Sequence, residues 1–225
     1  EVGYRLATNN YSTAYNDSLG IEKLQKYASL FGLNERTGIE IEEAAPQIAN
    51  EFPVMAAIGQ SNNNYTTVQL ARYVTAVANE GTVYQYTLLN RLEDSDGNVL
   101  QTFEPQVRNQ IDVLDTEEWN AIHSGMRMVV ENTKEFDGFP IEAAGKTGTA
   151  QQNLKRPNHA LFVGYAPYDD PEISIATRIA YGYTSHNAAK LARNVFAYYF
   201  NVENEDELLN GQAANGNSSS NEISD

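Results

Sequence analysis

The residues best suited to chemistry lie close together, between positions 143 and 152. This stretch reads Ala-Ala-Gly-Lys-Thr-Gly-Thr-Ala-Gln-Gln, so one cation, two hydroxyls and several small residues fall within ten positions. In a strand, alternate side chains share a side, which gives two groups: Lys146, Gly148 and Ala150 on one side, and Thr147, Thr149 and Gln151 on the other. A ligand could pair with the edge of such a strand through main-chain hydrogen bonds, while the lysine and the hydroxyls hold its polar groups.

A phosphate-binding loop is an alternative interpretation of the same residues, because Gly145-Lys146-Thr147 matches the end of the motif G-x-x-x-x-G-K-[ST]. That motif requires a glycine at position 140, where this chain has Pro140, and the nearest glycine is Gly138. No glycine-rich turn leads into a helix after the lysine. Spacing and context therefore exclude a phosphate loop. An ordinary strand with a solvated lysine remains the simplest account of the tripeptide alone. The surrounding sequence is therefore needed to distinguish such a strand from a functional site.

Helices that could position this stretch are indicated by capping residues and by apolar periodicity. Thr66 with Gln69, and Asp115 with Glu118, have the spacing of capping boxes. The predicted helical regions are residues 1–15 as the end of a helix, residues 21–31, Thr66 to Gly81, Asp115 to Val129, and a last helix that Ser185 or Asn187 begins. In the last helix, the residues predicted to face inward are Leu191, Ala192, Val195, Phe196 and Tyr199.

Alternating apolar and polar residues predict the strands. Residues 87–93 and 99–104 alternate around Asp94-Ser95-Asp96-Gly97-Asn98, which is a hairpin pattern. Residues 160–165 and 173–181 are predicted to be neighbouring strands that follow the central stretch. The order in this half of the chain is hairpin, helix, three strands and helix. It predicts an α+β fold, in which helices cover an antiparallel sheet.

Composition and charge exclude several classes of function. The net charge of -15 argues against a nucleic-acid partner, although the six acidic residues from Asn201 onward account for part of it and leave -9 before that point. The chain has no cysteine, so it has neither a disulfide framework nor a thiolate metal site. No apolar run approaches the roughly 18 residues that span a bilayer. The acidic side chains at positions 93, 94 and 96 lack the spacing of a calcium loop. His159 and His186 also lack metal-ligand spacing, so we expect no metal and no cofactor.

The wider sequence resembles a known family. Lys146 to Gln151, followed by His159-Ala160-Leu161-Phe162-Val163-Gly164-Tyr165-Ala166-Pro167, is similar to the third motif and the next strand of a penicillin-binding protein transpeptidase domain. Other stretches resemble class B members of this family, namely residues 27–33, 36–39, 57–60 and 70–81. The resemblance covers residues 1–202 in the family's order. Residues 203–225 are acidic and rich in Asn and Ser, and we expect a disordered tail there.

The resemblance implies the penicillin-binding protein/β-lactamase-like fold and acyl transfer through a serine ester. The serine would attack the bond between the two terminal D-alanines of a peptidoglycan stem peptide, and an amine of a neighbouring stem would then form the cross-link. β-Lactams would be recognised because they imitate the D-alanyl-D-alanine end. The residues implied to be catalytic are Lys146, Thr147 and Gly148, and those implied to bind substrate are Thr149 and Gln151. The N–H of Thr149 would be one of two oxyanion donors.

Two other motifs of the family are missing from this chain. No serine is followed three positions later by a lysine, and the three matches to S-x-N begin at Ser61, Ser185 and Ser219, each in the wrong place along the chain. A turn, a cap or a tail accounts for all three. We therefore expect the nucleophile in a missing upstream part of the same domain. We also expect an upstream transmembrane segment that anchors the parent protein at the outer face of the bacterial cytoplasmic membrane.

Other functions within reach of this sequence stay open. The expected partners are peptidoglycan stem peptides, β-lactam antibiotics and proteins of cell-wall synthesis. A family member without its nucleophile would be a non-catalytic scaffold or binding domain of a cell-wall complex. A β-lactam sensor or a β-lactamase shares Lys-Thr-Gly, but residues 20–81 and the hairpin argue against these more compact relatives.

Overall fold

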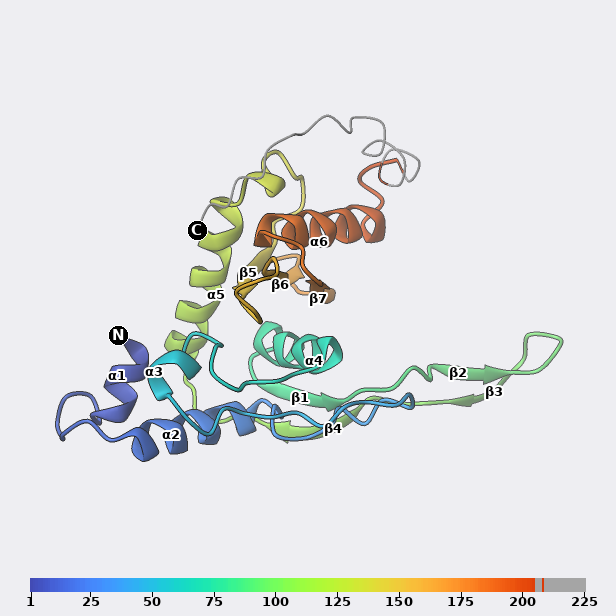
Figure 1. Cartoon of the computed structure of the whole chain (residues 1–225). Helices are drawn as coiled ribbons and strands as arrows, with labels where there is room; N and C mark the ends of the chain where they lie inside the picture. Colours follow the sequence, from blue (N-terminus) through green and yellow to red (C-terminus); the bar gives the residue numbers. More distant parts are fainter. Residues whose placement is uncertain (205–207, 209–225) are drawn as a thin grey trace. The chain divides into compact units, whose positions relative to one another are not determined.

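The computed structural model describes residues 1–204 and residue 208, and the chain divides into two compact units, Glu1–Trp119 and Asn120–Asp225 (Figure 1). The disordered tail predicted for residues 203–225 therefore lies almost entirely outside the described residues. Within the part of the chain that is described, no helix combines the length and the apolar character needed to cross a membrane.

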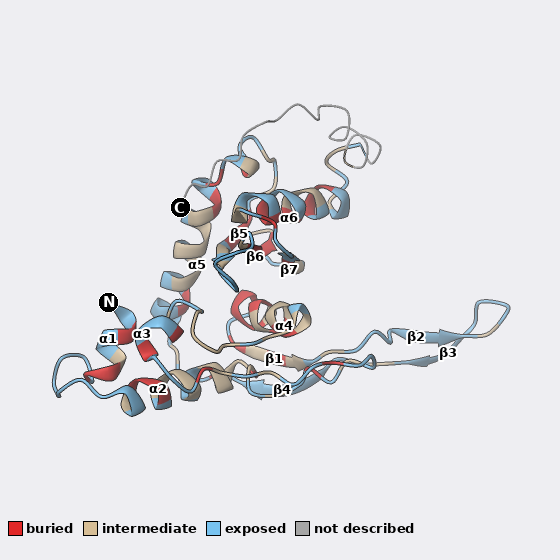
Figure 2. Ribbon diagram, in the orientation of Figure 1, coloured by how far each residue is buried: buried red, intermediate tan, exposed pale blue. Residues whose placement is uncertain are grey.

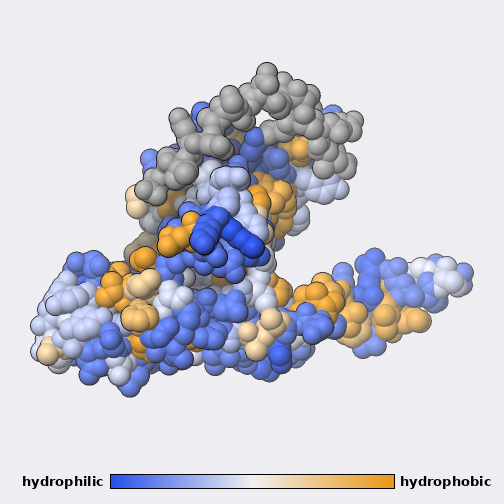
Figure 3. Space-filling model, viewed as in Figure 1, coloured by the Kyte–Doolittle hydropathy of each residue, from blue (hydrophilic) through white to orange (hydrophobic). Residues whose placement is uncertain are grey.

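The first unit consists of helices followed by two short antiparallel ladders. Its helices are α1 (Val2–Ala7), α2 (Asp17–Leu30), α3 (Pro53–Ala56) and α4 (Thr67–Ala78). Its strands are β1 (Thr82–Gln85), β2 (Arg91–Glu93), β3 (Val99–Thr102) and β4 (Gln106–Gln110), and β1 pairs with β4 while β2 pairs with β3. The strand residues of the β2–β3 hairpin are all exposed, and Figure 3 shows apolar side chains on its surface.

Helix α4 shows how local sequence sets this unit. The capping box predicted for Thr66 and Gln69 is present, with the Thr66 hydroxyl accepting from the Gln69 N–H and the Gln69 side chain accepting from the Thr66 N–H. Val74 and Val77 of α4 are buried. Arg72 is buried as well, and its guanidinium donates to the carbonyls of residues 32, 35 and 36. Because a buried guanidinium must find acceptors, α4 fixes the loop that follows α2.

Four predictions in the first unit are wrong in their extent: α2 begins at Asp17 rather than at residue 21, β3 ends at Thr102 rather than at residue 104, and the other two concern residues 1–15 and 87–93. The helix expected over residues 1–15 is confined to α1, because Asn9, Asn10 and Tyr11 have positive φ angles that end it. Residues 87–90 lie outside the strand predicted for residues 87–93. Strands β1 and β4 were not predicted at all, because their pairing joins residues that are far apart in the chain, and their register shifts between Val83 and Tyr84.

The second unit contains the sheet that carries Lys-Thr-Gly. Helix α5 (Thr116–Glu131) begins in the first unit and continues into the second, and its predicted cap is confirmed by the reciprocal bonds of Asp115 and Glu118, at 3.0 and 2.9 Å. A 3₁₀ turn, η1, then precedes three strands and a helix. These elements are η1 (Lys134–Phe136), β5 (Ala144–Ala150), β6 (His159–Ala166), β7 (Ile173–Ile179) and α6 (Ser185–Tyr199). The strands form an antiparallel sheet in the order β5-β6-β7, which confirms the prediction that the sheet is antiparallel and that the last two strands are neighbours.

Helix α6 covers one face of this sheet, and the buried stripe along it is red in Figure 2. Its core residues are Ala188, Ala189, Ala192 and Phe196, which pack with Phe162 of β6. The prediction that Leu191, Val195 and Tyr199 face inward is wrong, because they are 45%, 37% and 50% exposed. The face of α6 that contacts the sheet consists mostly of alanines, which let the helix lie close to the strands. The larger residues Leu191, Val195 and Tyr199 lie on the neighbouring face and point outward.

Candidate functional site

The Lys-Thr-Gly stretch forms strand β5, and this strand lies at the edge of its sheet. Among the described residues, β5 pairs with β6 alone. An edge strand presents a row of main-chain N–H and C=O groups that its own sheet does not use. The site predicted from sequence is therefore a strand whose free edge can accept an extended ligand.

Lys146 and Gly148 lie on one face of the strand. Lys146 is opposite Val163 and Gly148 is opposite Leu161 in the register with β6. Lys146 is exposed, and its Nζ donates to the carbonyl oxygen of Thr147 at 2.7 Å. The ammonium is therefore held against the main chain of its own strand, where it adds positive charge along β5.

The hydroxyl residues lie on the opposite face, as the alternation predicted. Thr147 is opposite Phe162 and Thr149 is opposite Ala160. Thr147 is half-buried, Thr149 is exposed, and Gln151 is exposed just beyond the end of the strand. The five predicted site residues are thus divided between two faces, and a ligand can contact both groups only by lying along the edge of β5.

The two glycines next to Lys146 and Thr147 have different roles. A Cβ on Gly145 would clash with Cζ of Phe162, so the phenyl ring fills the space beside this glycine. Gly145 is also directly opposite Gly164, whose own Cβ would meet the Ala144 carbonyl oxygen at 2.6 Å. At Gly148 the nearest atom would be Cβ of Leu161, at 3.3 Å. Gly145 therefore serves packing, whereas Gly148 keeps the strand approachable.

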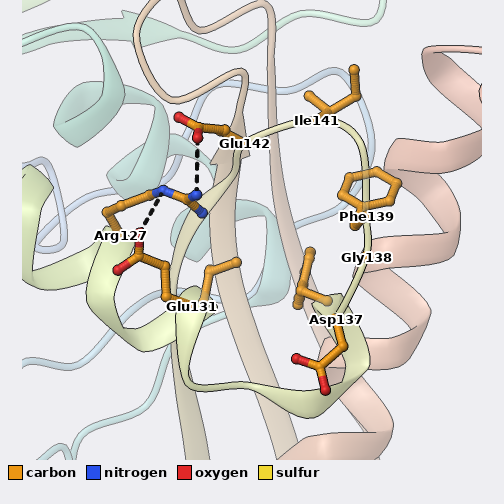
Figure 4. A pocket seen from close by; sticks show the side chains of 9 residues that line it. Arg127, Glu131, Asp137, Gly138, Phe139, Ile141 and Glu142 are labelled. Carbon is orange, nitrogen blue, oxygen red and sulfur yellow. Dashed lines mark ion pairs between the residues drawn. The ribbon is translucent and has the colours of Figure 1, made fainter.

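The start of β5 is tied to α5 by Arg127, which sequence reasoning missed. Arg127 Nη1 donates to the carbonyl of Ala143 at 3.1 Å, and its guanidinium pairs with Glu131 at 3.4 Å and Glu142 at 3.3 Å (Figure 4). A pocket of about 210 Å³ adjoins this arginine, with Phe136 and other apolar side chains in its lining. The salt bridges neutralise the arginine, so its role here is to join α5 to the residue before the strand.

The end of β5 is tied to β7 by His159, whose role was also missed. His159 is opposite Ala150 and is 6% exposed. Its Nε2 lies 2.9 Å from Oε1 of Gln152, and its Nδ1 accepts from the N–H of Tyr181 at 3.1 Å. Removal from water, with the nearby Arg178 charge, lowers the pKa of His159 below its ordinary value. No sequence motif predicts these contacts of His159, because the residues that make them come from three separate segments of the chain.

The serines that match S-x-N have local structural roles where the structure describes them, and the Ser61 hydroxyl donates to the carbonyl of Glu51 at 2.8 Å. The side chains of Asn62 and Asn63, which follow Ser61, accept from the backbone N–H groups of Asn50 and Ala49. Ser185 is the first residue of α6. Ser219 lies outside the described residues. Across residues 1–204 and 208, no three His, Asp or Glu side chains gather in a way that would hold a metal ion.

Comparison with known proteins gives a consistent result. Residues 5–197 match the family described as penicillin binding protein transpeptidase domain. Peptidoglycan D,D-transpeptidase MrdA of Haemophilus influenzae is 33% identical, over 85% of this chain and 34% of its own length. The structure of penicillin-binding protein 2B from Streptococcus pneumoniae strain R6 aligns with a TM-score of 0.75 at 24% identity, over 90% of this chain and 37% of that chain.

A structure of penicillin-binding protein A from Mycobacterium tuberculosis, an imipenem acyl-enzyme complex, aligns with a TM-score of 0.71 at 23% identity, over 81% of this chain and 43% of that chain. The chain spans about a third of the length of the curated relatives that it matches.

Proposed function

The chain belongs to the penicillin-binding protein transpeptidase family, class B type, with the α+β fold of that family, and we propose that it forms the substrate-binding part of a peptidoglycan D,D-transpeptidase. The observation that carries this proposal is the position of Lys146-Thr147-Gly148 on an edge strand whose outer side is unpaired among the described residues. An extended stem peptide would add to this edge as a strand, with main-chain hydrogen bonds to β5.

Each residue of the strand would have a distinct part in acyl transfer. The Lys146 ammonium would stabilise negative charge in the groove and attract the terminal carboxylate of the stem peptide. Thr147 and Thr149 would offer hydroxyls to the peptide, Gly148 would leave room for it, and Gln151 would contact it beyond the strand. The N–H of Thr149 would donate to the oxyanion, a contact worth about 3 kcal/mol of barrier.

The nucleophile would be a serine in the longer protein that contains this chain, here called the parent. Its hydroxyl oxygen would attack the carbonyl carbon of the penultimate D-alanine, and the terminal D-alanine would leave with the serine proton on its amine. An amine of a neighbouring stem would then attack the ester, form the cross-link and return a proton to the serine. Two facts support this division: the 225 residues contain no Ser-x-x-Lys, and they span about a third of the relatives' length.

The domain and its setting follow from the same proposal. Residues 1–202 would be the C-terminal portion of one transpeptidase domain, and residues 203–225 an acidic tail. The parent would be anchored by an upstream transmembrane segment at the outer face of the bacterial cytoplasmic membrane, where its peptidoglycan substrate lies. Its partners would be stem peptides, β-lactams and other proteins of cell-wall synthesis.

Covalent labelling with a fluorescent penicillin, read by intact mass, tests the proposal. We expect the parent to gain one label and this chain alone to gain none. Replacing Lys146 in the parent, as Lys146→Ala, should slow labelling by about 100-fold, since an electrostatic contact to the reacting group is lost. The matched control is Lys190→Ala, which removes another exposed lysine, on α6, and should label at the rate of the unmodified parent.

The other outcomes separate the alternatives. A folded parent that gains no label would support a non-catalytic scaffold of a cell-wall complex. A label that forms and is then hydrolysed within seconds would indicate a β-lactamase. Labelling of the isolated chain would overturn the assignment of the nucleophile to another part of the parent.

A further inference from the structure

The polar residues at the end of β5 form one connected group around His159. Its ring nitrogens contact Gln152, two residues beyond the strand, and the backbone of Tyr181, two residues beyond β7. The rings of His159 and Tyr181 lie 5.0 Å apart. Arg156, from the same loop as Gln152, donates to the Tyr181 hydroxyl at 2.6 Å and lies over its ring. The loop that follows the site strand is thus joined to the end of β7 twice, through His159 and through Tyr181.

The hydrogen bonds assign the protons on the His159 ring. A backbone N–H can only donate, so Nδ1, which faces the N–H of Tyr181, must carry a lone pair. The remaining proton is then on Nε2, where it is donated to Oε1 of Gln152. Both ring nitrogens are occupied in this tautomer, and a second proton on Nδ1 would point at another donor. The geometry therefore requires a neutral ring.

The charges around the ring favour the same form. Nη2 of Arg178, on β7, lies 3.4 Å from Nε2 and 3.5 Å from Nδ1 of His159. Tyr181 and Gln152 are its other polar contacts, and within the described residues no carboxylate is among them. A cation beside the ring and the loss of water both disfavour the imidazolium.

We propose that His159 is a positioning residue for the Lys-Thr-Gly strand, whose neutral ring holds Gln152 and thereby fixes the backbone of Thr149 to Gln151 for substrate. This proposal rests on the proposed function, because it concerns the same strand. The ladder with β6 ends at Ala150, and just beyond it the side chain of Gln152 contacts His159. Gln151 lies between Ala150, the last ladder residue, and Gln152. If the side chain of Gln152 were not held by His159, the backbone of Gln151 would be fixed at one end only. Protonation of Nδ1 removes the acceptor for the Tyr181 N–H, so the ring that holds Gln152 is no longer fixed to the end of β7.

The first test uses trypsin on the whole 225-residue chain and does not depend on activity. The loop contains a Lys155–Arg156 bond that trypsin cleaves, followed by an Arg156–Pro157 bond that resists it. We expect Gln152→Ala and His159→Phe to raise the rate of cleavage after Lys155 by about tenfold, because each removes a hydrogen bond that closes the loop. The control is Leu154→Ala in the same loop, whose side chain is 88% exposed and whose rate should not change.

Cleavage within α6, after Lys190, reports whether the fold is intact, since an unfolded variant is cut at both places. His159→Phe risks such unfolding because its side chain is buried, whereas Gln152 is exposed and its replacement keeps the test valid. If Gln152→Ala and the unmodified chain are cleaved after Lys155 at equal rates, the proposal that the His159–Gln152 contact holds the loop is overturned.

The second test is the pH profile of acylation by fluorescent penicillin in the parent, with and without Arg178→Gln. Removing the cation raises the pKa of His159, so the loss of rate at acid pH should begin at a higher pH in the variant. A role in packing alone would lower the rate equally at every pH, and an unmoved acid limb would overturn the positioning role. If the parent is not acylated at any pH, the proposed function fails. The trypsin result still decides whether the contact between His159 and Gln152 holds the loop.

Discussion

The β5–β7 sheet and the β2–β3 hairpin are both antiparallel and follow patterns visible in the sequence, but different forces hold them. The central strand β6 is buried along most of its length, with Phe162 and its neighbours in a core shared with α6. The strand residues of the hairpin are all exposed. A one-residue slip would expose the core face of the sheet, whereas in the hairpin it would bury or expose nothing. Packing thus sets the register of the sheet, and the turn sets that of the hairpin.

The turn of the hairpin is organised by Asp94. Its Oδ1 accepts from the N–H groups of Asp96 and Asn98, both at 2.9 Å, and its Oδ2 accepts from the side-chain amide of Asn98 at 2.8 Å. The acidic cluster seen in the sequence therefore includes a carboxylate that serves its own turn. An isolated two-stranded hairpin is marginal in water, so such local bonds carry much of its order.

The largest expected effect tests the packed side of this comparison. Phe162 is fully buried and stacks with Phe136 at a centroid distance of 5.7 Å. Phe162→Ala should lower the free energy of unfolding by about 3–5 kcal/mol, because it removes a ring from the core and leaves a cavity. Urea unfolding of the whole chain, monitored by hydrogen exchange of the β6 amides, measures this free energy. A loss below 1 kcal/mol would mean that the ring is not what holds the sheet.

The next effect distinguishes two glycines of the site strand. Gly145→Ala places a methyl group against the Phe162 ring and the Val163 carbonyl, so we expect a cost of about 1–3 kcal/mol from overpacking. Gly148→Ala is the matched control, since only Leu161 is near it. Its stability should change by less than about 0.5 kcal/mol, while acylation of the parent slows because the added methyl group lies beside the substrate edge. Equal losses of stability would show that both glycines serve packing.

A smaller effect concerns pH and the turn. Hydrogen bonds from the Asn98 side chain and from turn amides lower the pKa of Asp94 below its ordinary value. A carboxyl whose pKa is lowered in the fold contributes order that is complete above the ordinary pKa and is lost as the pH falls through the folded one. The amide resonances of Asp96 and Asn98 should therefore shift below about pH 4, in step with each other. Turn resonances that are unchanged at acid pH would contradict this account, and Asp94→Asn should show no acid transition.

Sequence reasoning succeeded where the signal was local and failed where it was not. The caps at Thr66 and Asp115 are decided within four residues, and both were predicted correctly. The inner face of α6 was predicted correctly for Ala192 and Phe196 and wrongly for Leu191, Val195 and Tyr199, because large apolar residues dominate the periodicity while most of the contacts are made by alanines. Strands β1 and β4 were missed because their pairing joins residues that are far apart in the chain.

The candidate site divides in the same way. Lys146, Thr147 and Gly148 are contiguous, so a short motif was enough to find them and to predict that they lie on a strand. That this strand is an edge depends on the pairing of the whole sheet. The His159 contacts join residues separated by 7 and 22 positions, one of them through a backbone N–H that carries no side-chain signature. Such contacts are a property of the assembled fold and have no pattern in a single sequence.

The smallest expected effect tests the exposed side of the comparison. Leu100 of β3 is 68% exposed, so Leu100→Ala removes little buried surface and should change the free energy of unfolding by less than about 0.5 kcal/mol. The same urea and exchange measurements as for Phe162→Ala provide the scale. If Leu100→Ala costs as much as a core substitution in the parent but not in this chain, the hairpin is covered by another part of the parent. The register of the hairpin would then be set by packing in the parent. The difference between the hairpin and the β5–β7 sheet would hold only for this chain by itself.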